Sequence, residues 1–441
     1  MKKIAVVFSI AAGLCLGFAG RAYAFHSGGV AECQGCHTMH NSLDGAAMGT
    51  GTNNVQFQGV QYLLIGQDQS STCLNCHGDS GTGGYHIFDD NVAAGVAPAN
   101  LTPGGDFGWL KKNFSWSPRA GVIETSDGER HGHNIVAVED GLLADGTLAT
   151  APGGTYPAAS LTCISCHDPH GKYRYLSTGA FATTGEPITA CGSYNNTAEP
   201  AAGLAVGAYR ILAGTGYEPR SQAGVGAFAS QPPVAVAPSS YNRTEAVTET
   251  RVAYGVGMSE WCANCHTDIH NNSLAAKLIH PAGNDAELGA TYAGLYDSYV
   301  VTGNLTGTNA TSYNSLVPFE EGGDPATPVT VRSAVKPHAF NNGSVTTGPS
   351  ATANLMCLSC HRAHASGWDS MTRWSNAMEF LTAEANTWPG SDLNPATYPD
   401  AAAAKFHQGR TNAEYSAAMG NKAASSLGYQ RSLCNKCHAK D

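Results

Sequence analysis

The sequence is poor in charge, and positive charge is the scarcer sign. Charged residues make up 13% of the 441 residues, and 24 lysines and arginines face 34 aspartates and glutamates, for a formal net charge of −10. A nucleic-acid-binding chain needs a basic face for phosphates. The composition therefore excludes nucleic acid as a partner.

Long apolar runs are also lacking. The longest, Ile4 to Phe18, follows two lysines and precedes the small-x-small triplet Ala22-Tyr23-Ala24, and it is shorter than the roughly 20 residues that span a bilayer. This pattern is typical of an export signal, so we expect cleavage after Ala24 and no transmembrane span. Cys15 raises the alternative of a lipoprotein, but Leu14 is bulkier than lipidation sites usually accept. Loss of three cations with the signal takes the charge from −10 to −13.

Few segments have a sustained apolar period, and the 52 glycines favour turns. The predicted fold class is mostly irregular, with short α-helices and little β structure. The likeliest longer helical region is 401–426, broken near Gly409 and Gly420. Such a chain has little from which to build an ordinary core, so a bound group must supply much of the buried apolar surface.

Cysteine, by contrast, is abundant and highly ordered. Twelve of the 14 cysteines fall into six copies of Cys-x-x-Cys-His. Two thiols at this spacing add to the porphyrin vinyl groups and the next residue places an imidazole on the iron, so each copy predicts a covalent c-type haem. Zinc sites and disulfides, the alternatives, do not require a histidine after every pair. The predicted attachment cysteines are Cys33, Cys36, Cys73, Cys76, Cys163, Cys166, Cys262, Cys265, Cys357, Cys360, Cys434 and Cys437, and the proximal iron ligands are His37, His77, His167, His266, His361 and His438.

One cysteine of the mature chain remains outside the motifs. Cys191 is predicted to be a buried thiol, with an intermolecular disulfide as the alternative in an oxidising compartment.

The motifs form a repeat with a period of two haems. The odd motifs carry a further histidine three residues after the proximal one, and the even motifs do not. The loose repeats are about 25–100, 101–335 and 336–441, within a single hexahaem domain of residues 25–441. Each repeat also has a histidine upstream of its first motif.

Seventeen histidines are enough to give every iron two imidazoles. A Cys-x-x-Cys-Lys motif would indicate a substrate-binding haem, and the sequence contains none. The upstream histidine is expected to serve the even haem of its own repeat, and the +3 histidine to serve a different haem. The predicted distal ligands are His26, His40, His133, His170, His338 and His364, while His86, His270 and His280 remain possible. His131 and His407 are expected to be solvated or hydrogen-bonded side chains.

Several stretches resemble one family closely. They include Phe25 to Ser42, TPGGDFGWLKK from Thr102, VGAYRILAGTGYEP from Val206 and CLSCHRAHASGWDSMTR from Cys357. The mature chain resembles the OmcS-type hexahaem c-type cytochromes, with departures mainly in 89–99 and 382–424. The resemblance implies six bis-histidine haems in one continuous chain, alternating slipped-parallel and T-shaped pairs. It also implies that His40 ligates haem 5 of a neighbouring subunit, with His170 serving haem 1 and His364 serving haem 3.

The expected function is electron transfer without bond-making catalysis. We expect a secreted cytochrome that polymerises into filaments at the cell surface and conducts electrons to mineral oxides, electrodes or partner cells. A multihaem oxidoreductase acting on a nitrogen or sulfur oxyanion is the main alternative, and a monomeric periplasmic shuttle is another.

Overall fold

The computed structural model describes most of the chain from Cys33 to His438, and all six motifs lie within it. The described residues are 33–38, 42–43, 46–47, 63–81, 86–178, 180–183, 185–190, 200–219, 226–233, 235–236, 252–270, 280–321, 347–428 and 430–438. Within these ranges, no helix is long and apolar enough to cross a membrane.

The helices are short, as the composition predicted. The longest in the described part of the chain, α5, has ten residues. The α-helices are α2 (Gln69–His77), α3 (Met258–Cys262), α4 (Thr267–His270), α5 (Gly289–Ser298), α7 (Cys357–Cys360), α8 (Ala404–His407), α9 (Asn412–Ala418) and α10 (Asn435–His438). The 3-10 turns are η1 (Cys33–Gly35), η3 (Phe107–Lys111), η4 (Gly128–Arg130), η5 (Ala158–Ser160), η6 (Cys163–Ser165), η7 (Tyr209–Ile211), η8 (Asp369–Met371), η9 (Glu384–Asn386) and η10 (Ala424–Leu427).

The helical region expected at 401–426 is broken where the glycines predicted. Gly409 and Gly420 have φ values of +79° and +67°, which glycine adopts without a steric penalty. Between them, Thr411 caps α9 in a reciprocal pair with Glu414. The result is α8, α9 and η10 in place of one helix.

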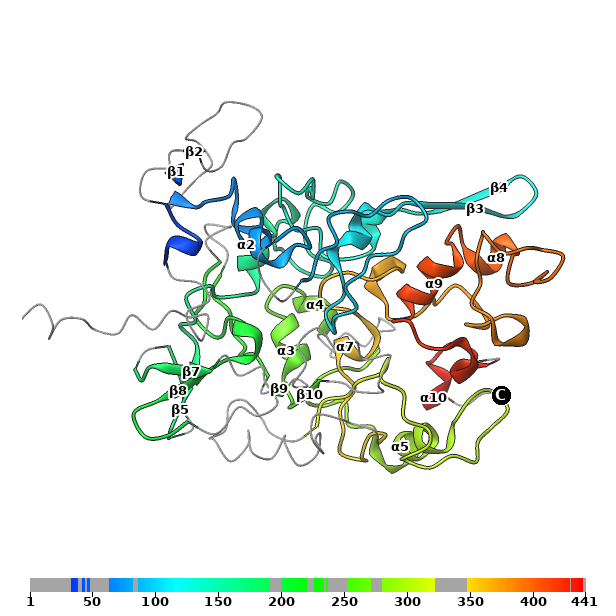
Figure 1. The fold of residues 1–441 in the computed structure, drawn as a ribbon. Helices are drawn as coiled ribbons and strands as arrows, with labels where there is room; N and C mark the ends of the chain where they lie inside the picture. The colour runs from blue at the N-terminus through cyan, green and yellow to red at the C-terminus, as the bar shows by residue number, and fades with distance from the viewer. Residues whose placement is uncertain are drawn as a thin grey trace, which may run out of the picture.

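The strands form small separate sheets. Strands β3 (Phe114–Arg119) and β4 (Val122–Ser126) make an antiparallel hairpin that projects from the body in Figure 1. A four-stranded sheet has the order β6-β5-β8-β7. Its strands are β5 (Arg174–Leu176), β6 (Phe181–Ala182), β7 (Ile188–Ala190) and β8 (Ala205–Gly207), and the two remaining pairs are β1 (Ser42–Leu43) with β2 (Ala46–Ala47) and β9 (Ala235–Val236) with β10 (Ala253–Tyr254).

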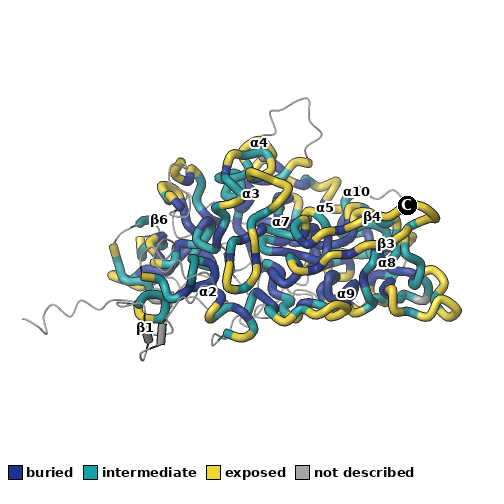
Figure 2. The backbone as a smooth tube through the Cα atoms, turned by 90° about the horizontal axis from the view of Figure 1, so that it is seen from above, coloured by how far each residue is buried: buried dark blue, intermediate teal, exposed yellow. Residues whose placement is uncertain are grey.

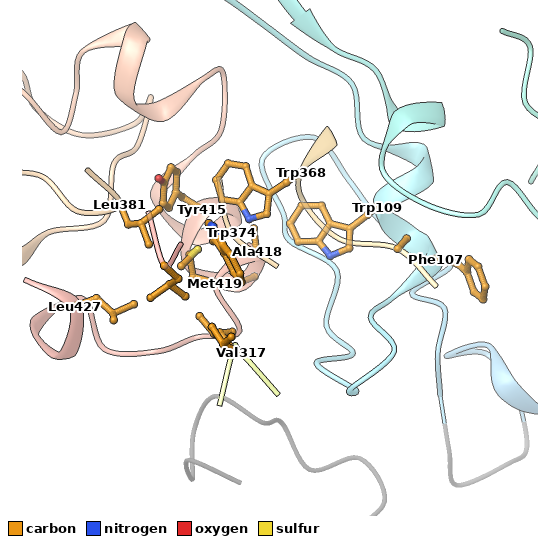
Figure 3. Close-up of a cluster of buried hydrophobic side chains, with 14 of the residues drawn as sticks. Phe107, Trp109, Val317, Trp368, Trp374, Leu381, Tyr415, Ala418, Met419 and Leu427 are labelled. Carbon is orange, nitrogen blue, oxygen red and sulfur yellow. The ribbon is translucent and has the colours of Figure 1, made fainter. Parts of the chain in front are cut away.

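The largest apolar cluster joins segments far apart in sequence. Trp109, Trp368 and Trp374 are 2–3% exposed and pack with side chains of α9 (Figure 3). The Arg410 guanidinium lies between two rings, 4.2 Å from the centre of Phe114 and 4.4 Å from that of Trp368. Figure 2 shows buried backbone through the middle of the molecule and exposed backbone at the outer loops. These three tryptophans therefore contribute to the packing of the core.

Candidate haem-binding site

Each haem motif forms one tight turn of backbone. In five motifs the histidine N–H donates to the carbonyl of the first cysteine, at 2.8–3.1 Å, as in His37 to Cys33 and His438 to Cys434. One helical turn brings positions i, i+3 and i+4 to the same side. Both thiols and the proximal imidazole of a motif therefore project together.

The six motifs follow one another in space in their sequence order. Figure 1 shows α2, α3, α7 and α10 in succession across the molecule. Burial raises the pKa of the Cys36 thiol, and Cys76 of the next motif adds to the shift. Burial likewise raises the pKa of Cys166, with Cys265 of the next motif contributing. Burial raises the pKa of Cys360 to about 12, again with a contribution from the next motif, here from Cys434.

Two of the junctions are closer than the others. The thiol of Cys73 in motif 2 hydrogen-bonds the thiol of Cys163 in motif 3, which raises the pKa of Cys73 and lowers that of Cys163. The thiol of Cys262 in motif 4 likewise hydrogen-bonds the thiol of Cys357 in motif 5, which raises the pKa of Cys262. The first four contacts thus alternate between second cysteines and first cysteines, which matches the two-haem period of the sequence.

The same serine hydrogen bond supports both close junctions. Ser70 Oγ accepts from the backbone N–H of Cys163, and Ser259 Oγ accepts from the N–H of Cys357, each at 3.1 Å. Both serines lie three residues before the first cysteine of their own motif, and both are 0% exposed. The first cysteines without such a neighbour, Cys33 and Cys434, are the two exposed ones among the twelve motif cysteines.

Pairs of imidazoles face each other at a separation that suits a metal ion between them. A metal–imidazole bond of about 2.0–2.1 Å, with the ring centre about 1.1 Å behind the nitrogen, places two axial rings roughly 6.2–6.4 Å apart. The ring centres are 6.4 Å apart for His37 and His170, 6.4 Å for His167 and His364, 6.0 Å for His133 and His266, and 6.1 Å for His280 and His438. The donor sets therefore fit an axially ligated haem iron.

Backbone carbonyls fix the orientation of several of these rings. The Nδ1 atoms of His167, His361, His266 and His133 lie 2.8 Å from the carbonyl oxygens of Arg210, Ser370, Pro152 and Ala363, respectively. Donation from Nδ1 leaves Nε2 as the free metal ligand and makes the imidazole more basic. This is the arrangement that a haem ligand needs.

Burial favours the neutral form of four imidazoles, those of His133, His364, His167 and His361. It lowers the pKa of His133 to about 4 and that of His364 to about 3, and it also lowers the pKa values of His167 and His361. A lowered pKa means that the neutral form dominates at pH 7, and only the neutral ring can bind a metal.

The structure brings together three histidine pairs that the repeat or the family resemblance had suggested. They are His37 with His170, His167 with His364, and His266 with His133. His26, His40, His338 and Cys191 lie outside the described residues, as does the side chain of His270. No ring pair of this kind joins His361 to another histidine in the described ranges.

One pairing was not selected from the sequence. His280 stands opposite His438, whereas the sequence favoured His338 for haem 6. His280 has no counterpart at the same offset in the other repeats, so no repeat signal could have selected it. The assignment of His338 stays a prediction.

The remaining histidines are held by protein groups. His131 is fully buried and bonds the Trp109 carbonyl at 3.0 Å and the Ser126 hydroxyl at 2.8 Å. His407 Nδ1 accepts from the Gly409 N–H at 2.9 Å. Both are hydrogen-bonded, the second of the two roles expected for them. His86 Nδ1 lies 3.3 Å from an oxygen of Asp79.

Comparison with known proteins agrees with this geometry. No family model matches the chain. The chain is 56% identical over 451 aligned residues to C-type cytochrome OmcS of Geobacter sulfurreducens, covering all of both chains. Two solved structures of OmcS from the same organism, one described as nanowires and one as a filament, match with a TM-score of 0.82 and 55% identity over 94% of this chain and 100% of theirs. The chain therefore belongs to the OmcS family of c-type cytochromes.

Proposed function

We propose that this protein polymerises head to tail into an extracellular filament that carries six covalent haems per subunit and conducts electrons along them. The observation that carries the proposal is the succession of the six motifs, each next to the following one, from η1 to α10. Bound at these cysteines, each haem supplies an iron that takes up and releases one electron. The relatives of solved structure are nanowires.

In this proposal every iron has two histidine ligands. His37 and His170 hold haem 1, His167 and His364 hold haem 3, and His266 and His133 hold haem 4. The facing pair His438 and His280 makes His280 the proposed distal ligand of haem 6. For haem 2, His77 is paired with His26, and His86 is the alternative.

Haem 5 is proposed to be completed by a second copy of the chain. The +3 histidines of motifs 3 and 5 serve haems 1 and 3, so each ligates the iron of the preceding odd haem. Among the three odd motifs in the 441 residues, none follows motif 5 with a +3 histidine for haem 5. His40, the +3 histidine of motif 1, is then left to ligate haem 5 of the neighbouring subunit.

The exposed cysteines support the same head-to-tail contact. First cysteines meet in pairs within the chain, Cys73 with Cys163 and Cys262 with Cys357. Cys33 and Cys434, at opposite ends of the motif series, are exposed. A contact of the same type between the Cys434 end of one copy and the Cys33 end of the next gives an open filament when the rotation does not close.

An extracellular location is part of the proposal, because the N-terminus has the pattern of an export signal. Residues 1–24 are proposed to direct secretion and to be removed, and the mature filament then lies at the outer cell surface. Mineral oxides, electrodes and partner cells are the proposed acceptors. With both axial positions filled by histidine, no iron is left for a nitrogen or sulfur oxyanion.

The test is the variant His40→Ala, with His407→Asn as a matched control at a histidine that bonds only backbone. We expect His40→Ala to keep six haems, to gain one high-spin iron per subunit that binds carbon monoxide, and to lose filaments by electron microscopy. His407→Asn should form normal filaments. Normal filaments of the His40→Ala protein with six low-spin irons would contradict the proposed contact, and a carbon monoxide adduct in the unmodified protein would favour an enzyme.

A further inference from the structure

Eight described non-glycine residues have left-handed backbone, and most of them lie beside haem motifs. Three of the eight, Asn386, Gln408 and Asn421, lie in the C-terminal part away from the motif turns. The other five are Leu63 (φ 56°), Arg210 (50°), Ile211 (53°), Ser370 (57°) and Met371 (47°). Residues other than glycine, asparagine and aspartate have a steric cost in this conformation.

These five residues occupy equivalent places at the three odd motifs. The residue after each proximal histidine donates its N–H to a left-handed residue: Thr38 to Leu63 at 2.7 Å, Asp168 to Ile211 at 2.9 Å and Arg362 to Met371 at 2.8 Å. Two positions further on, the chain donates back to the second cysteine of the motif: Ile65 to Cys36, Ala213 to Cys166 and Arg373 to Cys360. The proximal histidine is bridged to the residue between these two.

At motifs 3 and 5 two consecutive residues are left-handed, and the first of them faces the imidazole. The carbonyl oxygens of Arg210 and Ser370 lie 2.8 Å from Nδ1 of His167 and His361. Two successive left-handed residues turn the chain so that one carbonyl meets the ring and the next meets the backbone N–H. A β-branched residue such as Ile211 is a poor choice for this turn by local preference alone.

Strain of this kind persists where surrounding structure enforces it, and it concentrates at functional sites. Its recurrence at equivalent positions, 160 residues apart in sequence, argues against a local accident of packing. Ser370 is exposed, so no burial of its side chain explains its conformation. The feature that both turns share is the carbonyl on the proximal imidazole.

We propose that the turns Arg210-Ile211 and Ser370-Met371 are positioning elements that hold a backbone carbonyl against the Nδ1–H of the proximal imidazoles of haems 3 and 5 and thereby lower the reduction potentials of these haems. The inference rests on the proposed ligation by His167 and His361. A carbonyl that accepts from Nδ1–H increases the electron donation of the imidazole and favours the oxidised iron. The Leu63 turn is the counterpart at motif 1.

Substitutions at Ser370 separate the backbone conformation from the side chain. Ser370→Asn keeps a residue that tolerates the left-handed region, so it should leave haem 5 unchanged. Ser370→Val disfavours the turn and weakens the carbonyl contact. Outer-shell partners of a metal ligand affect binding by at least about tenfold. We therefore expect a shift toward reduction of roughly tenfold in the one-electron equilibrium of one haem, about 59 mV. Asn421→Val, at another exposed left-handed residue (φ 57°), is the matched control and should shift no haem.

The measurement is a potentiometric titration of the purified holoprotein, with haem content and carbon monoxide binding as checks on the ligation itself. A positive shift of one component in Ser370→Val only, with six low-spin haems retained, supports the proposal. If that variant does not accumulate, Ser370→Thr is the milder β-branched form, with a smaller shift in the same direction. Unchanged potentials in the folded valine or threonine variant overturn the proposal, as does an equal shift in Ser370→Asn.

Discussion

Ser70 Oγ accepts a hydrogen bond from the backbone N–H of Cys163 at 3.1 Å, across 93 positions of sequence. Ser259 repeats this bond with Cys357 at the same distance. Each serine holds the helix of an even motif, α2 or α3, against the turn of the following odd motif. The two bonds set the register at the two junctions where first cysteines meet.

We expect Ser70→Ala or Ser259→Ala to loosen one junction each. The variant leaves a partly buried N–H without its acceptor, which costs about 1 kcal/mol, the lower end of the range for a buried donor. The free energy of unfolding should fall by that amount in urea titrations. The Soret circular dichroism, which reports the relative orientation of neighbouring haems, should also change. Ser117→Ala, at an exposed serine whose Oγ bonds the Arg119 carbonyl, should alter neither measurement.

The two histidines of Arg130-His131-Gly132-His133 should behave differently when truncated. His133 faces His266 across 6.0 Å, whereas His131 bonds Trp109 and Ser126. His133→Ala should therefore convert one of the proposed six irons to a high-spin, carbon-monoxide-binding form. His131→Ala should lower stability, because it removes two hydrogen bonds of a fully buried side chain and leaves a cavity in its place, while all irons stay low-spin. High-spin iron in both variants, or in neither, would contradict the assignment of His133.

The planes of the paired imidazoles predict distinct paramagnetic signals. The rings of His37 and His170 are nearly parallel, at 8°, and those of His280 and His438 are nearly perpendicular, at 85°. Perpendicular axial rings give a more anisotropic low-spin signal than parallel ones. Low-temperature electron paramagnetic resonance of the oxidised protein should show both types, and His280→Ala should remove the highly anisotropic one. Persistence of that signal in the variant would leave His338 as the ligand of haem 6.

The stability of the protein should depend on pH through Glu320. This carboxyl is fully buried and accepts from the Met258 N–H at 3.1 Å. Burial, with a further contribution from Glu260, raises the pKa of Glu320 from 4.5 to about 8. Between pH 4.5 and pH 8 the carboxyl of Glu320 is therefore protonated in the folded protein and ionised in the unfolded chain. The contribution of Glu320 to the free energy of unfolding falls as pH rises through that window.

Glu320→Gln should remove this pH dependence because glutamine does not ionise. We expect the unfolding free energy of the variant to fall less than that of the unmodified protein between pH 5 and pH 8, a window set by the two pKa values of the carboxyl. Asp369→Asn is a suitable comparison, since that carboxylate is 44% exposed and pairs with Arg130. Parallel stability curves for Glu320→Gln and the unmodified protein would show that the carboxyl ionises normally.

The sequence by itself determined everything that depends on local spacing. Haem attachment needs two thiols and an imidazole within one turn, and five consecutive residues such as Cys163 to His167 supply them wherever the chain runs. The +3 histidines were visible for the same reason, because His40, His170 and His364 recur at one short offset from a proximal histidine. Low charge and frequent glycine predicted short elements, and the breaks at Gly409 and Gly420 followed from φ values that favour glycine.

Only the tertiary structure decided which distant groups meet. His280 faces His438, and no repeat in the sequence marks His280, because the path of the connecting chain sets this distance. Cys73 and Cys163 come into contact through the packing of α2 against η6, which no spacing encodes. The left-handed turns at Arg210 and Ser370 run against local preference, and the hydrogen bonds of the neighbouring motif enforce them. Covalent haem attachment is local and therefore legible in the sequence, whereas axial ligation and the contacts between motifs depend on the folded path of the whole chain.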